Sequence, residues 1–168
     1  LPRADAVRAA LSKLELSVLS EVVASNDTAQ AAMVRLPAHG WSEKDGTVTN
    51  SERRISRQRA FMKPAGHARA DWWILSQVAA RLGWGDAFAY TSASEIFREH
   101  AALSGFENAG ERVFDISGLA DLSDTAYDDM QPIQWPVRRD SVRDGAQCSK
   151  RVFTDGQFAT PGGRARFV

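Results

Sequence analysis

Residues 41–59 hold a dense group of charged and hydrogen-bonding side chains, and they are the first candidates for chemistry. The segment reads WSEKDGTVTNSERRISRQR. Its cations are Lys44, Arg53, Arg54, Arg57 and Arg59. Guanidinium and ammonium groups pair well with phosphate oxygens, so this segment could anchor a phosphorylated ligand. Mixed charge runs also form solvated surface strands, and the residue types alone leave both interpretations open.

The overall composition narrows the class of protein. The 168 residues include 21 basic and 21 acidic side chains, and the hydrophobic share of 43% is ordinary for a globular protein. Such a charge balance argues against general nucleic-acid binding, which favours a basic domain. No apolar run approaches the roughly 20 residues that a membrane helix needs. We therefore expect a globular α/β chain with neither nucleic acid nor a membrane span.

The metal-ligand residue types are sparse. Cys148 is the one cysteine of the chain, whereas an iron–sulfur site takes several. We interpret it as an unremarkable thiol in a polar loop. His39, His67 and His100 are far apart and show no metal-ligand spacing. The sequence therefore predicts no metal site in this chain.

The first 40 residues alternate between helical and strand patterns. We expect a helix at residues 4–13 with Asp5 as N-cap, and a buried parallel strand at residues 14–23. A short helix capped by Asp27 and Thr28 would run to residue 33, and a strand at residues 34–36 would stop at Pro37. This alternation is typical of a doubly wound, Rossmann-like α/β domain.

In such sheets, ligands bind beyond the carboxyl ends of the strands. Ser20 and Glu21 lie near that end of the first expected strand. A carboxylate there can accept hydrogen bonds from ribose hydroxyls or from a guanine edge. An ordinary strand terminus is the plainer alternative. A GxGxxG turn is absent, so a nicotinamide site has no direct support.

The remaining segments predict a helical and loop-rich second half. We expect a short strand at residues 47–49, a loop at 61–66, helices at 70–82 and 94–103, a short helix within 123–130, a loop from 134 through Cys148, a hairpin around 154–156 and a β-prone end at 164–168. The inward positions of the two longer helices are predicted to be Trp73, Val78, Leu82, Ile96, Phe97, Ala101 and Leu103. Gly83 and Gly105 would end these helices. Asp71, in the first turn at residues 70–82, could simply cap that helix.

Longer stretches resemble one family. LPAHGWSEKDGTVTNSERRISRQR, GHARADWWILSQVAARLGW, EIFREHAALSGFENAGERVFDISGLA, YDDMQPIQWPV and FTDGQFATPGGRARFV are similar to the molybdopterin oxidoreductases that carry molybdenum bis-(molybdopterin guanine dinucleotide). Within them they most resemble bacterial assimilatory nitrate reductases. The resemblance runs over essentially the whole chain but covers an internal part of such an enzyme. It implies a parent enzyme that reduces nitrate to nitrite in nitrate assimilation.

The resemblance also implies roles for particular residues. Ser20 and Glu21 stand where the family carries a Ser-Asp pair that contacts the guanosine end of one cofactor arm, although Glu21 is one methylene longer. Lys44 matches the cofactor-contacting lysine of the EKDG motif, and Asp71 matches the aspartate that pairs with the guanine base. Guanine offers the two parallel donors N1–H and N2–H₂, which suit a carboxylate. The second-tier candidates, which would shape the pocket, are Gly46, Thr47, Asn50 and Arg53.

The sequence departs from many relatives at two further positions, His67 and Ala70, where glutamate and proline are common. No residue is expected to be catalytic or to ligate molybdenum, and the iron–sulfur cluster would be bound elsewhere in the parent. The partners implied are the remaining domains and an electron donor protein or reductase, in the cytoplasm.

The expected segments are residues 1–90, an α/β part that binds the molybdopterin guanine dinucleotide, and residues 91–168, an extension that ends in a hairpin and leads to a further domain. Two other functions stay open: the same segment of a formate dehydrogenase catalytic subunit, and a stand-alone nucleotide-binding module. The QWP and FREHAALSGFEN stretches favour nitrate reductase over formate dehydrogenase.

Overall fold

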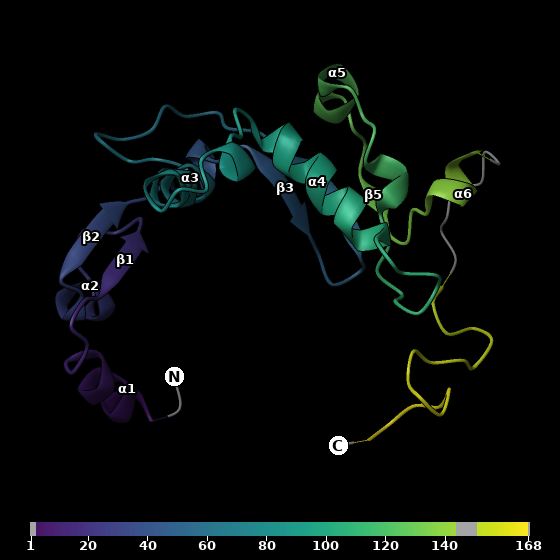
Figure 1. Ribbon diagram of the computed structural model, residues 1–168, viewed down its shortest axis with the longest axis horizontal. Helices are drawn as coiled ribbons and strands as arrows, with labels where there is room; N and C mark the ends of the chain where they lie inside the picture. Colours follow the sequence, from purple (N-terminus) through teal and green to yellow (C-terminus); the bar gives the residue numbers. More distant parts are fainter. Residues whose placement is uncertain (1–2, 144–150, 168) are drawn as a thin grey trace. The chain divides into compact units, whose positions relative to one another are not determined.

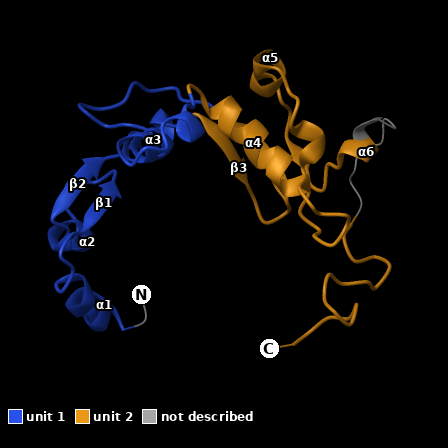
Figure 2. Cartoon of the chain, in the orientation of Figure 1, with its two compact units in different colours: residues 1–44, 59–90 blue, residues 45–58, 91–168 orange. Residues whose placement is uncertain are grey.

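The computed structural model describes residues 3–143 and 151–167, which contain two compact units (Figure 1, Figure 2). The first unit comprises residues 1–44 and 59–90, and the second comprises residues 45–58 and 91–168. Residues 45–58 group with the second unit, although they precede residues 59–90 of the first unit in the chain. They do so because their second strand pairs with a strand near residue 134.

The first unit is built around a two-stranded parallel sheet. β1 (Val18–Glu21) pairs with β2 (Val34–Pro37), with Ser20 opposite Leu36 and Glu21 opposite Pro37. The other elements of the unit are α1 (Ala4–Leu11), α2 (Asp27–Ala31), the 3₁₀ turn η1 (Trp41–Glu43), α3 (Asp71–Arg81) and the 3₁₀ turn η2 (Asp86–Phe88). The described residues thus form a mixed α/β unit with a small sheet.

Several expectations for this unit were wrong in detail. The strand expected at 14–23 is limited to four residues, because β2 offers only four partners, of which Pro37 is the last. It is also not buried, since Val18 is 52% exposed. The N-caps are Arg3 and Asn26 rather than Asp5 and Asp27, and α2 ends at Ala31.

The second unit contains a three-stranded antiparallel sheet. β4 (Arg54–Gln58) lies between β3 (Gly46–Thr49) and the short β5 (Ile133–Gln134). The helical elements are α4 (Ala93–Gly105), the 3₁₀ turn η3 (Ser117–Leu119), α5 (Asp124–Asp128) and α6 (Arg139–Arg143). α6 falls within the loop expected from residue 134 onwards, and Cys148 lies outside the described residues.

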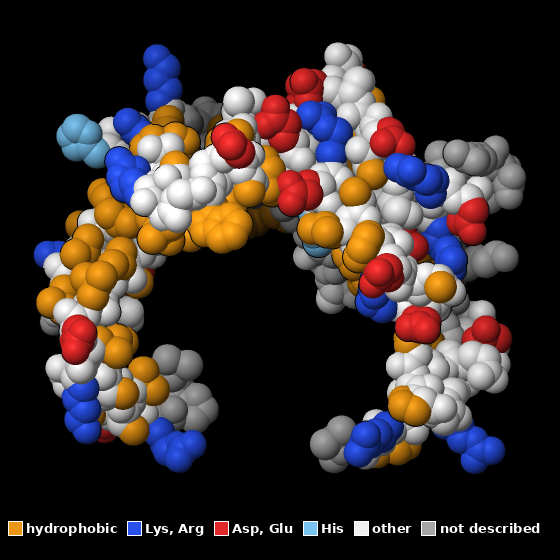
Figure 3. Space-filling model, in the orientation of Figure 1, with side chains coloured by type: hydrophobic (Ala, Val, Ile, Leu, Met, Phe, Trp, Pro, Cys, Tyr) orange, Lys and Arg blue, Asp and Glu red, His pale blue; other side chains and the backbone are white. Residues whose placement is uncertain are grey.

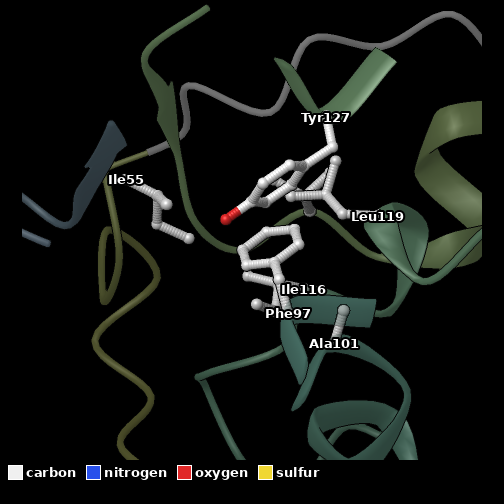
Figure 4. Packing of buried hydrophobic residues seen from close by; sticks show 7 residues of the cluster. Ile55, Phe97, Ala101, Ile116, Leu119 and Tyr127 are labelled. Carbon is white, nitrogen blue, oxygen red and sulfur yellow. The ribbon is translucent and has the colours of Figure 1, made fainter. Parts of the chain in front are cut away.

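A hydrophobic core fills the second unit. Phe97 and Ala101 of α4 meet Ile55 of β4, Ile116 and Tyr127, all at most 5% exposed (Figure 4). The Phe97 and Tyr127 rings lie with their centroids 5.3 Å apart. This core gives the second unit its own source of stability.

The buried faces of the two long helices differ partly from those expected. α4 buries Ser94, Phe97, Ala101 and Ser104, whereas Leu103 is 59% exposed because it lies off this face. α3 buries Ser76 and Ala79, whereas the residues expected to face inwards, Trp73, Val78 and the C-cap Leu82, are exposed. The ends of these helices near Gly83 and Gly105 were predicted correctly.

The hairpin expected around residues 154–156 is absent from the described residues. Phe153 adopts a left-handed conformation with φ of 63°, which interrupts an extended strand. Its ring stacks on Phe158 with centroids 4.8 Å apart. The segment therefore folds as turns, and residues 164–167 form no strand either.

Gly105 permits the close approach of α4 to η3. A Cβ added at Gly105 would lie 2.5 Å from the Cβ of Ser117. We expect Gly105→Ala to lower the free energy of unfolding by about 1–3 kcal/mol through overpacking, measured as a lower urea midpoint of this chain. The matched control is Gly162→Ala, where an added Cβ meets nothing within 4 Å. Equal midpoints for the two variants would contradict this packing argument.

Candidate functional site

Asp71 is the centre of a polar cluster in the first unit. Its Oδ1 accepts a hydrogen bond of 2.8 Å from the hydroxyl of Ser20, and its Oδ2 lies 3.0 Å from Nζ of Lys44. Of the eight residues predicted to bind a ligand, the structure thus brings these three together. Ser20 lies on β1, Lys44 directly follows η1, and Asp71 is the first residue of α3.

Two backbone links fix the start of α3 beside the end of β2. The amide of Arg69 donates to the carbonyl of Pro37, and the amide of His39 donates to the carbonyl of Arg69, each at 3.0 Å. Because Asp71 is the first residue of α3, its negative charge also lies favourably at the positive end of the helix dipole. These links carry Asp71 to the carboxyl end of the parallel strands.

Glu43 fixes the turn that positions Lys44. Its Oε2 accepts from the amide of Gly40 at 2.7 Å, and its Oε1 accepts from the amide of Ala65 at 2.8 Å. These hydrogen bonds hold the pKa of Glu43 below its usual value, the contact with Gly40 being the strongest cause. Glu43 was not among the predicted site residues, although its spacing of three from Gly40 is that of a capping box.

The carboxylate of Asp71 is kept ionised by its neighbours. Partial burial by itself raises the pKa of Asp71, but hydrogen bonds from Lys44 and Ser20 and the positive charge of Lys44 outweigh it, so the pKa is lowered. The side chain remains 48% exposed. An ionised carboxylate only accepts hydrogen bonds and has about four lone-pair directions. Asp71 can therefore accept from a ligand while keeping both present partners.

Glu21 is turned towards the loop that follows β1. Its Oε1 accepts from the amides of Val22 and Val23 at 2.7 and 3.2 Å, and its Oε2 accepts from the side-chain amide of Asn26 at 2.9 Å. The hydrogen bond from Asn26 is the main cause that lowers the pKa of Glu21. Asn26 in turn caps α2. In this arrangement Glu21 shapes the loop between β1 and α2.

The four second-tier candidates belong to the second unit. Gly46 and Thr47 lie on β3, and Asn50 closes the turn to β4 by accepting hydrogen bonds from the amides of Glu52 and Arg54 at 3.0 Å each. Arg53 adopts a left-handed φ of 68°, and its guanidinium carbon lies 5.3 Å from the ring centroid of Trp135. Their described contacts build the β3–β4 turn.

Arg57 is a buried structural cation of the second unit. Its side chain is 3% exposed and pairs with Asp45 and Asp128 at 2.9 and 3.1 Å. Its guanidinium also lies 4.1 Å from the ring centroid of Tyr127. From the sequence, Arg57 was one of the candidates for phosphate binding. Ile55, two residues earlier on β4, faces inwards, and this spacing places Arg57 on the same buried face of the strand.

The described residues hold no group of three or more metal-ligating side chains placed to bind a metal ion. Within these residues, no helix combines the length and apolar character needed to cross a membrane. The Asp71 cluster presents a charged acceptor flanked by a hydroxyl and an ammonium group.

Lys44→Met is expected to raise the pKa of Asp71 towards its ordinary value, because it removes the strongest hydrogen bond and the nearest positive charge. The folded-state pKa of Asp71 is lowered, so its stabilising effect is present at neutral pH and is lost as the pH falls from the ordinary aspartate value through the lowered one. Carboxyl ¹³C NMR titration measures the shift. Lys63→Met, an exposed cation of the same unit, is the control and should leave the pKa of Asp71 unchanged.

Comparison with known proteins gives the cluster a context. Residues 2–81 match the family model described as molybdopterin oxidoreductase. A nitrate reductase of Klebsiella oxytoca is 60% identical over 139 residues, which make up 83% of this chain and 16% of that protein. A nitrate reductase of Shewanella frigidimarina is 46% identical over 170 residues, covering 100% of this chain and 18% of its own length. The chain thus spans about a sixth of the length of these two relatives.

Two further similarities are more limited. A formate dehydrogenase alpha subunit of Methanocaldococcus jannaschii is 42% identical over 98 residues, or 58% of this chain and 14% of that subunit. Among solved structures, acetylene hydratase from Pelobacter acetylenicus superposes with a TM-score of 0.57 and 18% sequence identity, covering 92% of this chain and 18% of that chain. At this identity the structural match shows similarity of fold alone.

Proposed function

We propose that this chain is a segment of a molybdenum-dependent nitrate reductase. The premise is that residues 2–81 belong to the molybdopterin oxidoreductase family. In this proposal the parent reduces nitrate to nitrite in nitrate assimilation, and the segment holds the guanosine end of one molybdopterin guanine dinucleotide. The observation that carries the proposal is the 60% identity to a nitrate reductase over 83% of the chain.

The Asp71 cluster fits the guanine end of such a cofactor. The carboxylate is half exposed, and both of its oxygens are held by donors of the protein. Guanine presents N1–H and N2–H₂ in parallel, and a carboxylate is the complementary acceptor. Because Lys44 and Ser20 favour the ionised form, Asp71 presents no competing donor at neutral pH. The donor set of this structure therefore supports guanine binding at Asp71.

The other site residues would support this contact in different ways. Lys44 supplies a positive charge beside the carboxylate, and its ammonium group would suit a guanine carbonyl or a phosphate oxygen. Ser20 and Glu21 lie at the carboxyl end of β1, and Glu21 shapes the loop between β1 and α2. For the second-tier residues Gly46, Thr47, Asn50 and Arg53, a role in shaping the pocket is proposed on the family resemblance alone.

We further propose that β1 and β2 are part of a larger Rossmann-like, doubly wound sheet. A parallel pair joined through a helix is the unit from which such sheets are built. Among the described residues of the first unit, the buried hydrophobic side chains are alanines alone: Ala29, Ala38, Ala68 and Ala79. Larger apolar side chains gather at the surface over β1 and β2 (Figure 3). A unit with this surface is suited to burial inside a larger domain.

The chemistry of the reaction belongs to the cofactor. When bound, molybdenum supplies oxygen-atom transfer coupled to two-electron redox change, and the protein supplies binding, orientation and electrostatics. The residues of this segment would bind and orient the nucleotide arm. We expect no turnover by this chain alone, and we assign the iron–sulfur cluster to other parts of the parent. An electron donor protein or reductase and a cytoplasmic location are proposed on the family resemblance alone.

The alternative substrate, formate, has weaker support. The formate dehydrogenase match covers 58% of the chain, whereas the nitrate reductase matches cover 83% and 100%. Nitrate is therefore the favoured substrate. A stand-alone nucleotide-binding module would lack the molybdenum centre altogether.

Replacing Asp71 by Asn in the parent enzyme tests the guanine contact. The amide turns one acceptor into a donor that faces the donors of guanine, so we expect cofactor binding to weaken by about 1–3 kcal/mol, as for loss of a charged hydrogen bond. Molybdenum and guanine content of the purified protein measure retention. Asp86→Asn, an exposed carboxylate of the same unit, is the control. Full retention in Asp71→Asn would remove Asp71 from the site.

The parent enzyme is expected to contain molybdenum and to reduce nitrate with a chemical electron donor, while leaving formate unoxidised. Metal analysis and a nitrite assay on the protein from its source cells test both statements. Formate oxidation without nitrate reduction would replace the proposed substrate. A native protein of this size without molybdenum would overturn the enzyme assignment.

A further inference from the structure

A pocket of about 330 Å³ lies on the first unit, between the end of β2 and one face of α3. It is separate from the Asp71 cluster, since Ser20, Lys44 and Asp71 are not among its lining residues. Its apolar walls come from Leu36 of β2 and from a face of α3. Nucleotide binding at the Asp71 cluster therefore gives this pocket no role.

The pocket follows the length of α3. Its helical lining residues are Trp73, Ile74, Gln77, Val78 and Arg81. Positions four apart in a helix lie one above the other, so these residues form a continuous stripe. They span eight helical steps, about 12 Å at 1.5 Å per residue. Trp73 and Val78 are 40% and 49% exposed, so a long apolar stripe is open to a partner.

The charged groups at this stripe are all basic. The guanidinium carbon of Arg69 lies 5.6 Å from the ring centroid of Trp73, and its NH1 donates to the carbonyl of Ala68 at 2.9 Å. Arg81 donates to the carbonyl of Gln77 at 2.8 Å. Within residues 3–143 and 151–167, neither arginine forms an ion pair, and the lining contains no carboxylate. The pocket is therefore complementary to an apolar partner that carries negative charge.

We propose that this stripe is the docking site of an acidic amphipathic helix from the part of the longer polypeptide that lies outside these 168 residues. The chain spans about a sixth of its nitrate reductase relatives, so most of such a polypeptide is available to supply the helix. The first unit buries only alanines among its described hydrophobic residues, so its helices need cover from elsewhere. An apolar ridge of the incoming helix packs along Trp73, Ile74 and Val78, and its carboxylates pair with Arg69 and Arg81. This inference rests on the proposed longer polypeptide but not on its substrate.

Photo-crosslinking in the full-length polypeptide tests the docking. A benzoylphenylalanine placed at Gln77 is expected to form an intramolecular cross-link to a peptide outside this segment that is rich in Asp and Glu and has helical apolar spacing. Peptide mass spectrometry identifies the product. The matched control places the same group at Gln30, an exposed glutamine on α2 of the same unit, and should not capture that peptide.

Charge variants then test the ion pairs. Arg81→Glu is expected to reduce the Gln77 cross-link, whereas Arg81→Lys should retain it and Arg8→Glu, on the exposed surface of α1, should have no effect. A cross-link to a separate protein, capture of the same peptide from Gln30, a captured peptide without carboxylates, or no cross-link at all would each overturn the proposal. The cross-link does not depend on nitrate reduction. A positive cross-link in a protein without nitrate activity would therefore contradict the proposed function and leave the docking proposal intact.

Discussion

The ionised carboxylate of Asp71 is the constraint on which the candidate site depends. Ser20 reaches it from the end of a strand, and Lys44 reaches it from a turn held by Glu43. Three separated segments of the chain thus converge on one acceptor. Such a half-exposed charge is stabilised by its donors and remains open to a ligand, which is the arrangement that recognition of a two-donor base edge requires.

The second unit differs, because its main charged group, the guanidinium of Arg57, is buried. Arg57 is nearly inaccessible, and it is compensated by Asp45 and Asp128 and by the face of Tyr127. This cation joins the β3–β4 hairpin to α5 beside the hydrophobic core. Two carboxylates pair with this buried cation, which offsets much of the cost of its burial, although its Nε lies buried without a hydrogen-bond partner among the described residues. The unit therefore combines a core of large side chains with an internal ion-pair network.

The two units differ in how complete they are as folding units. The second buries Ile55, Phe97 and Tyr127, whereas the described buried hydrophobic residues of the first are alanines. Burial of large apolar side chains is the dominant source of stability in proteins. The first unit presents its larger apolar residues outwards, which suits a part of a larger assembly. The Asp71 cluster thus lies on the unit whose described buried hydrophobic residues are all alanines.

Local sequence patterns determined much of the secondary structure and the candidate residues. The helical periodicity near residues 71–81 and the stop at Pro37 were visible because each depends on near neighbours in the chain. Lys44 and Asp71 were singled out by the family resemblance. The lengths of strands depend on their partners, and this is why β1 has only four residues.

Only the tertiary structure decided which polar groups meet. It joined Ser20 to Asp71 across 51 positions, turned Glu21 towards Asn26, and buried Arg57 against Tyr127. Contacts of this kind depend on how distant segments pack together, and residue spacing along the chain does not encode them directly. The sequence by itself determined which donors and carboxylates are available, and its resemblance to a family suggested a nucleotide as their ligand. The fold decided which of them meet at Asp71 and which form contacts elsewhere, because those contacts depend on the packing of distant segments.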